Sequence, residues 1–161
     1  MENWPKQNIE QDNNFIIDNF LSDEEKECLI NSMGSRAGNS VAKRLMEQVG
    51  KTVELSVIRN SKNELVGVIV LDNKENNDTR EISYWLDEKY RGENIITNIV
   101  ENQIVPACYK NNITKLIAHI FASNMPSIKT IGKLGFSEIT EKEQEIDGVD
   151  IFKTFERQLL I

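Results

Sequence analysis

The segment from residue 65 to residue 71 reads LVGVIVL, so it is apolar along its whole length. Runs of this kind are typical of a central strand that is covered on both faces, because a strand with one wet face alternates apolar and polar residues. The need for cover on both faces constrains the fold strongly, since it predicts a sheet with further layers packed against it.

Two further strands are predicted on either side of this segment along the chain. Val53, Leu55 and Val57 alternate with polar residues, which is the period of a strand. Residues 60–63 (NSKN) have turn chemistry, and residues 81–86 (EISYWL) read as the next strand. We expect the three strands to form an antiparallel meander.

The residues before the meander predict a short strand and two helices. Residues 15–20 (FIIDNF) read as the strand, and Ser22–Glu25 fits the Ser-x-x-Glu capping box that begins a helix. We expect Gly34 and Gly38 to break that helix. A second helix is then predicted over residues 40–50, where the apolar side chains return to helical spacing.

After the meander, the pattern alternates between helices and strands. Residues 95–110 place apolar side chains at helical spacing, and Pro106 predicts a kink or a ragged last turn because proline removes a backbone donor. Residues 115–121 (KLIAHIF) read as a strand. The next helix is predicted to begin at Asn124, with Gly135 as its C-terminal cap.

The last part of the chain predicts a hairpin. Residues 136–144 and 149–159 pair across Asp147-Gly148, which is a strong turn signal. The element order is therefore β-α-α-β-β-β-α-β-α-β-β, which places the chain in the α/β (α+β) class. Its length of 161 residues fits a single domain.

Composition argues against several classes of protein. The net charge of −7 offers no basic face for nucleic acid. Cys28 and Cys108 lie far apart beside a single histidine, so we expect small apolar cysteines rather than a disulfide framework or a metal site. Residues 1–14 lack a secretory signal, and no apolar run approaches the roughly 18 residues of a membrane span. We therefore expect a soluble, cytoplasmic protein that binds neither nucleic acid nor membrane.

Two predicted helices begin directly after strands, at residues 91–94 (RGEN) and at residues 124–127 (NMPS). The first amide groups of a helix lack partners within the helix and carry the positive end of its dipole. The backbone alone can therefore hold a phosphate at such a point. Each turn has two interpretations at this level, a phosphate site or an ordinary connection.

Two motifs place the chain near a known family. Residues 82–92 (ISYWLDEKYRG) resemble the fourth strand and the start of the acyl-CoA loop of the GNAT superfamily of N-acetyltransferases, and they are most similar to its RimJ/RimL-like branch. Residues 124–136 (NMPSIKTIGKLGF) resemble the second motif of that branch, N-x-x-S-x-x-x-x-x-K-x-G-F. The resemblance implies one GNAT-like acetyltransferase domain over residues 1–161, with a loose polar lead at residues 1–13. It also implies a mixed, mostly antiparallel central sheet with a splayed parallel strand pair and flanking helices.

The resemblance implies acetyl-CoA as the donor and assigns residues to it. The backbone near Leu86 would pair with the pantetheine arm, and Asn124 would hydrogen-bond the same region. Ser127 would protonate or hydrogen-bond the departing thiolate. The diphosphate would meet the amides of one continuous run, which comprises Arg91, Gly92, Glu93, Asn94, Ile95 and Ile96.

Three positions of this loop depart from the family pattern, which reads Arg/Gln-x-x-Gly-x-Gly/Ala. Arg91 matches, whereas Asn94 and Ile96 stand at the two glycine positions, and Glu93 adds negative charge where the branch often has Lys. Asn adopts a left-handed backbone better than most residues do. Ile96, however, puts a branched side chain where a small one lets the diphosphate approach. These differences predict weak binding of acetyl-CoA.

Acylation of an amine also needs a base or a water chain to take up a proton. Glu81 is the first candidate, with a strand-end carboxylate in water as the alternative. His119 lies on an apolar strand, where a lone histidine is more often structural. Two acidic clusters favour a cationic acceptor, with a merely solvated surface as the alternative. They comprise Asp18, Asp23, Glu24, Glu25 and Glu27, and Glu138, Glu141, Glu143, Glu145 and Asp147.

Together these features predict an N-acetyltransferase that moves an acetyl group from acetyl-CoA directly to a primary amine, either a protein N-terminus or a small cationic amine. The alternative is a catalytically degenerate GNAT-fold module that binds or senses acyl-CoA, which the residues at Asn94 and Ile96 favour. The sequence leaves open both the identity of the acceptor and the formation of a homodimer.

Overall fold

The computed structural model describes residues 9–10, 15–37, 39–73, 76–146 and 150–159. The chain forms two compact units. The N-terminal unit holds residues 4–72 and 84–91, and the C-terminal unit holds chiefly residues 73–83 and 92–161. Strand β5 (Thr79–Leu86) begins in the C-terminal unit and ends in the N-terminal unit.

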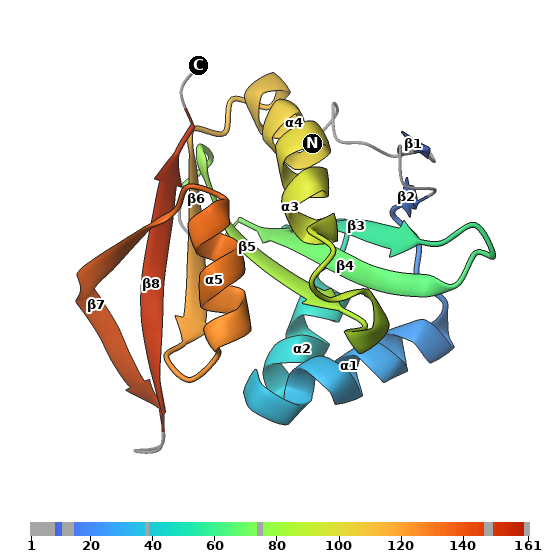
Figure 1. Cartoon of the computed structure of the whole chain (residues 1–161), viewed down its shortest axis with the longest axis horizontal. Helices are drawn as coiled ribbons and strands as arrows, with labels where there is room; N and C mark the ends of the chain where they lie inside the picture. The colour runs from blue at the N-terminus through green and yellow to red at the C-terminus, as the bar shows by residue number, and fades with distance from the viewer. Residues whose placement is uncertain (1–8, 11–14, 38, 74–75, 147–149, 160–161) are drawn as a thin grey trace. The chain divides into compact units, whose positions relative to one another are not determined.

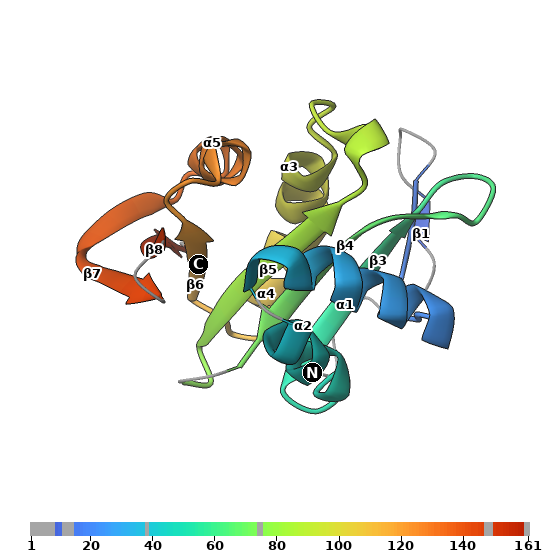
Figure 2. The same cartoon turned by 90° about the horizontal axis from the view of Figure 1, so that it is seen from below.

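The N-terminal unit is an antiparallel set of strands with two helices on one side (Figures 1 and 2). Its strands pair in chain order: β1 (Ile9–Glu10), β2 (Ile16–Asp18), β3 (Val53–Arg59) and β4 (Leu65–Asp72). The helices are α1 (Asp23–Ala37) and α2 (Asn39–Glu47). As its apolar sequence predicts, β4 is buried at every position after Leu65.

Gly67 of β4 allows this strand to approach the end of β5 closely. A Cβ atom at this position would lie 2.5 Å from the carbonyl oxygen of Trp85 and 3.0 Å from a side-chain carbon of Leu86. A side chain would therefore have to displace backbone, which explains why the run LVGVIVL contains a glycine in an otherwise packed strand.

The start of α1 is held by a capping box and by a buried arginine. The Ser22 hydroxyl accepts from the amide of Glu25 at 3.1 Å, and the Glu25 carboxylate accepts from the amide of Ser22 at 3.0 Å, which confirms the predicted box. The Arg59 guanidinium donates to Glu25 at 2.7 Å and to Asp18 at 2.8 Å. Because Arg59 hydrogen-bonds Glu25, the pKa of this carboxyl falls from 4.5 to about 2.

The C-terminal unit contains a parallel pair of strands. Thr79–Glu81 of β5 pairs in parallel with Lys115–Ile117 of β6 (Lys115–Phe121). Strand β6 pairs antiparallel with β8 (Asp150–Gln158), which in turn pairs antiparallel with β7 (Ser137–Ile146). The sheet is thus mixed and mostly antiparallel, as expected. The predicted hairpin is confirmed, although its Asp147-Gly148 turn lies outside the described residues.

Three helical elements lie on one side of these strands (Figures 1 and 2). They are α3 (Ile95–Ile99), α4 (Val105–Lys110) and α5 (Met125–Lys133). The covered side of β6 carries Leu116, Ala118 and Ile120, which are all buried. The opposite side carries Ile117, which is buried, and His119, which is exposed.

Pro106 shapes the helix that contains α3 and α4. The two are joined by a π-helical segment, η2 (Val100–Ile104), in which the amide of Val105 donates to the carbonyl of Val100. We expected a kink or a ragged last turn at Pro106. The structure instead widens the helix directly before the proline, and this wider turn relieves the contact between the proline ring and the preceding turn.

Two expectations about helix α1 are wrong. The helix continues through Gly34 to Ala37, because one glycine costs only about 1 kcal/mol in a helix and does not by itself end one that packs against a neighbour. Cys28 of α1 is exposed rather than apolar core. Cys108 is buried as expected, and burial raises the pKa of its thiol to about 12, which makes it unreactive.

Candidate active site

The loop before α3 has the backbone of an anion-binding turn. Arg91, Gly92, Glu93 and Asn94 are all exposed. Gly92 has a φ of 86° and Asn94 a φ of 58°, both in the left-handed region. This confirms the expectation that Asn94 tolerates a left-handed backbone at the first glycine position of the family loop.

Asn94 is the N-cap of α3 but its side chain does not cap the helix. Its Oδ1 atom instead accepts a hydrogen bond of 3.2 Å from Nζ of Lys133, at the end of α5. The side chain that would ordinarily accept from the first amides of the helix is therefore turned away from them. The positive end of the helix dipole lies at this turn.

Ile95 and Ile96 follow the loop and point into the core. Ile96 is only 4% exposed and Ile95 only 3%. We expected the branched side chain of Ile96 to crowd a diphosphate at the loop. The side chain is buried among apolar residues, and its effect on diphosphate binding stays a prediction.

Arg91 and Leu86 belong to the N-terminal unit, where they contact each other. The Nε atom of Arg91 donates to the carbonyl of Leu86 at 3.2 Å, and its Nη1 lies 3.9 Å from the carboxylate of Glu88. Asp87, directly after β5, donates its amide to the carbonyl of Val66 at 2.8 Å. The end of β5 is thus fixed to β4, and the charge of Arg91 is partly compensated.

Asn124 and Ser127 form the first turn of α5 in the C-terminal unit. Oδ1 of Asn124 accepts from the amide of Ser127 at 3.4 Å, so Asn124 is the N-cap of this helix. The cap uses the carbonyl oxygen of the side chain, and its NH₂ group is the part suited to donate to a ligand. Ser127 is half-buried.

Glu81 of β5 is half-buried and lies on the same face of the sheet as His119. It is opposite Ile117 in the parallel pair, and His119 and Phe121 follow on the same face by the period of a strand. Nδ1 of His119 lies 3.0 Å from the hydroxyl of Thr154. The rings of Phe121 and Phe152 stack with centroids 4.3 Å apart. A carboxylate, an imidazole and an aromatic pair thus share one face.

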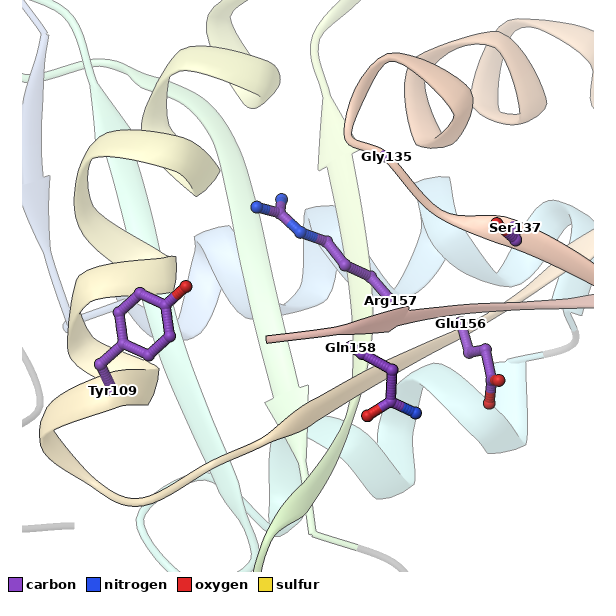
Figure 3. Close-up of a pocket in the computed structure, with 6 residues that line it drawn as sticks. All are labelled: Tyr109, Gly135, Ser137, Glu156, Arg157 and Gln158. Atoms are coloured by element: carbon purple, nitrogen blue, oxygen red, sulfur yellow. The ribbon is translucent and has the colours of Figure 1, made fainter. Parts of the chain in front are cut away.

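A cavity of about 460 Å³ also opens in the C-terminal unit (Figure 3). Its lining comprises Tyr109, Gly135, Ser137, Glu156, Arg157 and Gln158. Tyr109 stands near the end of α4, at the opposite end of that helical segment from the loop at 91–94. Arg157 is engaged by Glu101 and by the carbonyl of Leu134. None of the predicted site residues lines this cavity.

Over the described residues, no group of three or more His, Cys, Asp or Glu side chains is placed to hold a metal ion. Within the same part of the chain, no helix has both the length and the apolar character needed to cross a membrane.

Sequence patterns did not assign a role to Lys133. Lys133 is the lysine of the motif NMPSIKTIGKLGF, which by itself assigns it no contact. In the structure it contacts Asn94, which lies 39 positions earlier in the chain. The spacing of apolar residues in the sequence cannot predict this contact, because it depends on how α3 and α5 pack.

Solved structures of acetyltransferases share this fold. A putative phosphinothricin N-acetyltransferase superposes with a TM-score of 0.72 at 19% identity, over 91% of this chain and 99% of the other. The ribosomal-protein-S5-alanine acetyltransferase of Vibrio fischeri gives a TM-score of 0.70 at 15% identity, over 96% and 97% of the two chains. The spermidine N-acetyltransferase of Vibrio cholerae, solved in complex with CoA and spermine, gives a TM-score of 0.70 at 13% identity, over 91% and 96%.

Comparison of the sequence with protein-family models shows the family of this chain. No curated protein matches the chain. The family model described as the acetyltransferase (GNAT) domain matches residues 7–137, which is most of the chain. This agrees with the mixed sheet, with the left-handed turn before α3 and with the shared fold of the solved acetyltransferases. The chain therefore belongs to the GNAT acetyltransferase family.

Proposed function

We propose that this protein transfers the acetyl group of acetyl-CoA to a primary amine, either a small amine or a protein N-terminus. The observation that carries the proposal is the left-handed turn at Gly92 and Asn94 directly before α3, where the Asn94 side chain does not cap the helix. Enzymes of this family use acetyl-CoA, and one solved structure with the same fold holds CoA.

The donor would be held by backbone and side chains of both turns. The turn that begins at Gly92 would receive the diphosphate, because it precedes the positive end of a helix and Glu93 and Asn94 are exposed there. The NH₂ group of Asn124 would donate to the pantetheine arm. The residues present fit such a donor, since Ile96 keeps its side chain in the core.

The reaction would be a direct transfer. The neutral amine attacks the thioester carbonyl carbon and forms a tetrahedral intermediate. The carbon–sulfur bond then breaks, and the hydroxyl of Ser127 protonates or hydrogen-bonds the departing CoA thiolate. Glu81 would take up the amine proton, directly or through a water, because its side chain is partly accessible to solvent.

The acceptor class follows from the family rather than from a particular contact. Similar structures are named as acetyltransferases of spermidine and of the alanine of ribosomal protein S5. Both substrates present an amine. For this chain, Asp18 and Glu25 are compensated by Arg59, and Glu138 is paired with Lys153. The argument for a cation therefore rests on the exposed carboxylates of α1, which are Asp23, Glu24 and Glu27.

Calorimetric titration with acetyl-CoA and with desulfo-CoA tests the donor site. We expect saturable binding of both ligands, because the diphosphate and pantetheine contacts do not involve the sulfur atom. A titration without heat of binding at millimolar ligand would overturn the proposal. Binding without transfer to any amine would instead support the acyl-CoA sensor as the function.

A further inference from the structure

The cavity of about 460 Å³ lies where strand β8 extends past the start of β7 (Figure 3). Pairing of β7 with β8 begins at Ser137 and Glu156, so Gln158 has no partner on β7. The chain before Ser137 does not continue along β8, because Gly135 has a φ of 76° and its amide donates back to the carbonyl of Gly132 at 3.1 Å. The end of β8 therefore forms one wall of the cavity.

The backbone of Gln158 points into this cavity. On its other edge β8 pairs with β6, where Gln158 is opposite Lys115. Next to this pair, the amide of Leu159 donates to the carbonyl of Thr114 at 2.7 Å. Successive residues of an antiparallel strand direct their N–H and C=O groups to opposite edges. Gln158 thus points both groups away from β6, to the place where β7 would continue, and no strand of the described residues pairs with them there.

The charged groups at the cavity already have partners. The guanidinium of Arg157 donates to the carboxylate of Glu101. The carboxylate of Glu156 lies 3.8 Å from Nζ of Lys115. An ion that entered the cavity would have to compete with these pairs, whereas a neutral ligand would leave them intact. The remaining polar groups of the lining are neutral, and they comprise the hydroxyls of Tyr109 and Ser137 and the amide of Gln158.

We propose that this cavity binds an extended peptide segment, whose backbone pairs with Gln158 in line with β7. An extended residue offers one N–H and one C=O on the same edge, which is the complement of the two free groups of Gln158. The cavity falls within the roughly 300–1,000 Å³ of ligand pockets, so it has room for a few residues rather than for a long strand.

The other wall of the cavity is formed by Tyr109, near the end of α4 (Figure 3). Its side chain is 37% exposed and supplies both an apolar ring and a hydroxyl to a peptide that lies against it. The turn at Gly92 lies before the opposite end of this helical segment, so the peptide site is separate from the proposed donor site. The inference therefore goes beyond the proposed function and is tested without acetyl-CoA.

The test is a titration of isotope-labelled protein, followed by the NMR shifts of its backbone amides. The probe is the peptide Thr-Val-Thr-Val-Thr, acetylated at its N-terminus and amidated at its C-terminus. We expect saturable shifts of the amides of Gln158, Ser137 and Gly135. The same peptide methylated on all of its peptide nitrogens cannot donate to Gln158, and it should bind roughly three- to tenfold more weakly, as the loss of a hydrogen bond predicts.

Two variants of one residue separate backbone from side chain. Gln158→Pro removes the N–H that faces the cavity and leaves the bonds to β6 in place, so it should fold and should lose about the same affinity. Gln158→Ala keeps the N–H and should bind as the wild type does. If Gln158→Pro does not fold, the two peptides compared on the wild type still decide.

Three results would overturn the inference. The first is the absence of saturable shifts at the cavity with the unmethylated peptide. The second is equal affinity of the wild type for the two peptides, which would exclude pairing through the backbone. The third is a set of shifts at the same amides with sodium acetate but not with the peptide, which would indicate an anion site at Arg157 instead.

Discussion

Ser127 supplies the hydroxyl that we propose to protonate or hydrogen-bond the departing CoA thiolate. Its amide is held by Asn124, which fixes the first turn of α5 independently of the hydroxyl. We therefore expect Ser127→Ala to fold normally and to lower kcat by about 10- to 100-fold, with little change in the KM for the acceptor. An interaction made only in the transition state appears in kcat. Steady-state kinetics measures this, and an unchanged kcat would return Ser127 to a structural role.

Glu81 is the proposed base. Replacing it by Gln keeps the shape of the side chain and removes its ability to take up a proton. We expect Glu81→Gln to lower the rate by roughly 10²-fold or more near neutral pH and to move the pH–rate profile to higher pH, where more of the amine is already neutral. His119→Gln, on the same face of the sheet, is the matched comparison and should keep the wild-type profile. Superimposable profiles for Glu81→Gln and wild type would exclude Glu81 as the base.

Among the elements, the junction of α1 with β2 and β3 depends on the Arg59 cluster. Glu25 has a pKa of about 2 in the folded protein, against 4.5 for the free carboxyl, because Arg59 hydrogen-bonds it. The contribution of Glu25 to stability is therefore full above pH 4.5 and is lost as the pH falls toward 2. Glu25→Gln should lower the free energy of unfolding by roughly 1–3 kcal/mol near pH 7.

Thermal unfolding between about pH 7 and pH 2 measures this difference. The melting temperatures of wild type and Glu25→Gln should converge as the pH falls. Glu24→Gln changes the same chemistry at an exposed neighbour and should follow the wild type throughout. A gap between wild type and Glu25→Gln that stays constant to low pH would mean that the Arg59 pair does not control the stability of this junction.

The same elements show what a sequence can predict. The capping box at Ser22 and Glu25, the left-handed Asn94 and the cap at Gly135 are local features, and all three are confirmed because each depends on a few consecutive residues. Helix α1 continues through Gly34 because of its packing, and the π-helical turn before Pro106 results from relaxation of the backbone. The spacing of apolar residues predicts neither feature.

The candidate site also has a part that the sequence predicts and a part that it does not. Its motifs are readable in the sequence, because the turns at 91–94 and 124–127 are continuous. The direction of the Ile96 side chain and the contact between Lys133 and Asn94 were not predictable, since both depend on how helices pack in three dimensions. The first buries a branched side chain at the start of α3, and the second places a lysine beside Asn94.

For the molecule as a whole, the central claim is that this member of the GNAT family transfers acetyl from acetyl-CoA to an amine. The direct measurement is release of free CoA thiol in the presence of acetyl-CoA and a panel of amines, with mass spectrometry of each acceptor. The account predicts thiol release that depends on the amine and matches, mole for mole, the gain of one acetyl group on that amine. Thiol release that is absent for every small amine and peptide N-terminus, by a protein that binds acetyl-CoA, would contradict it.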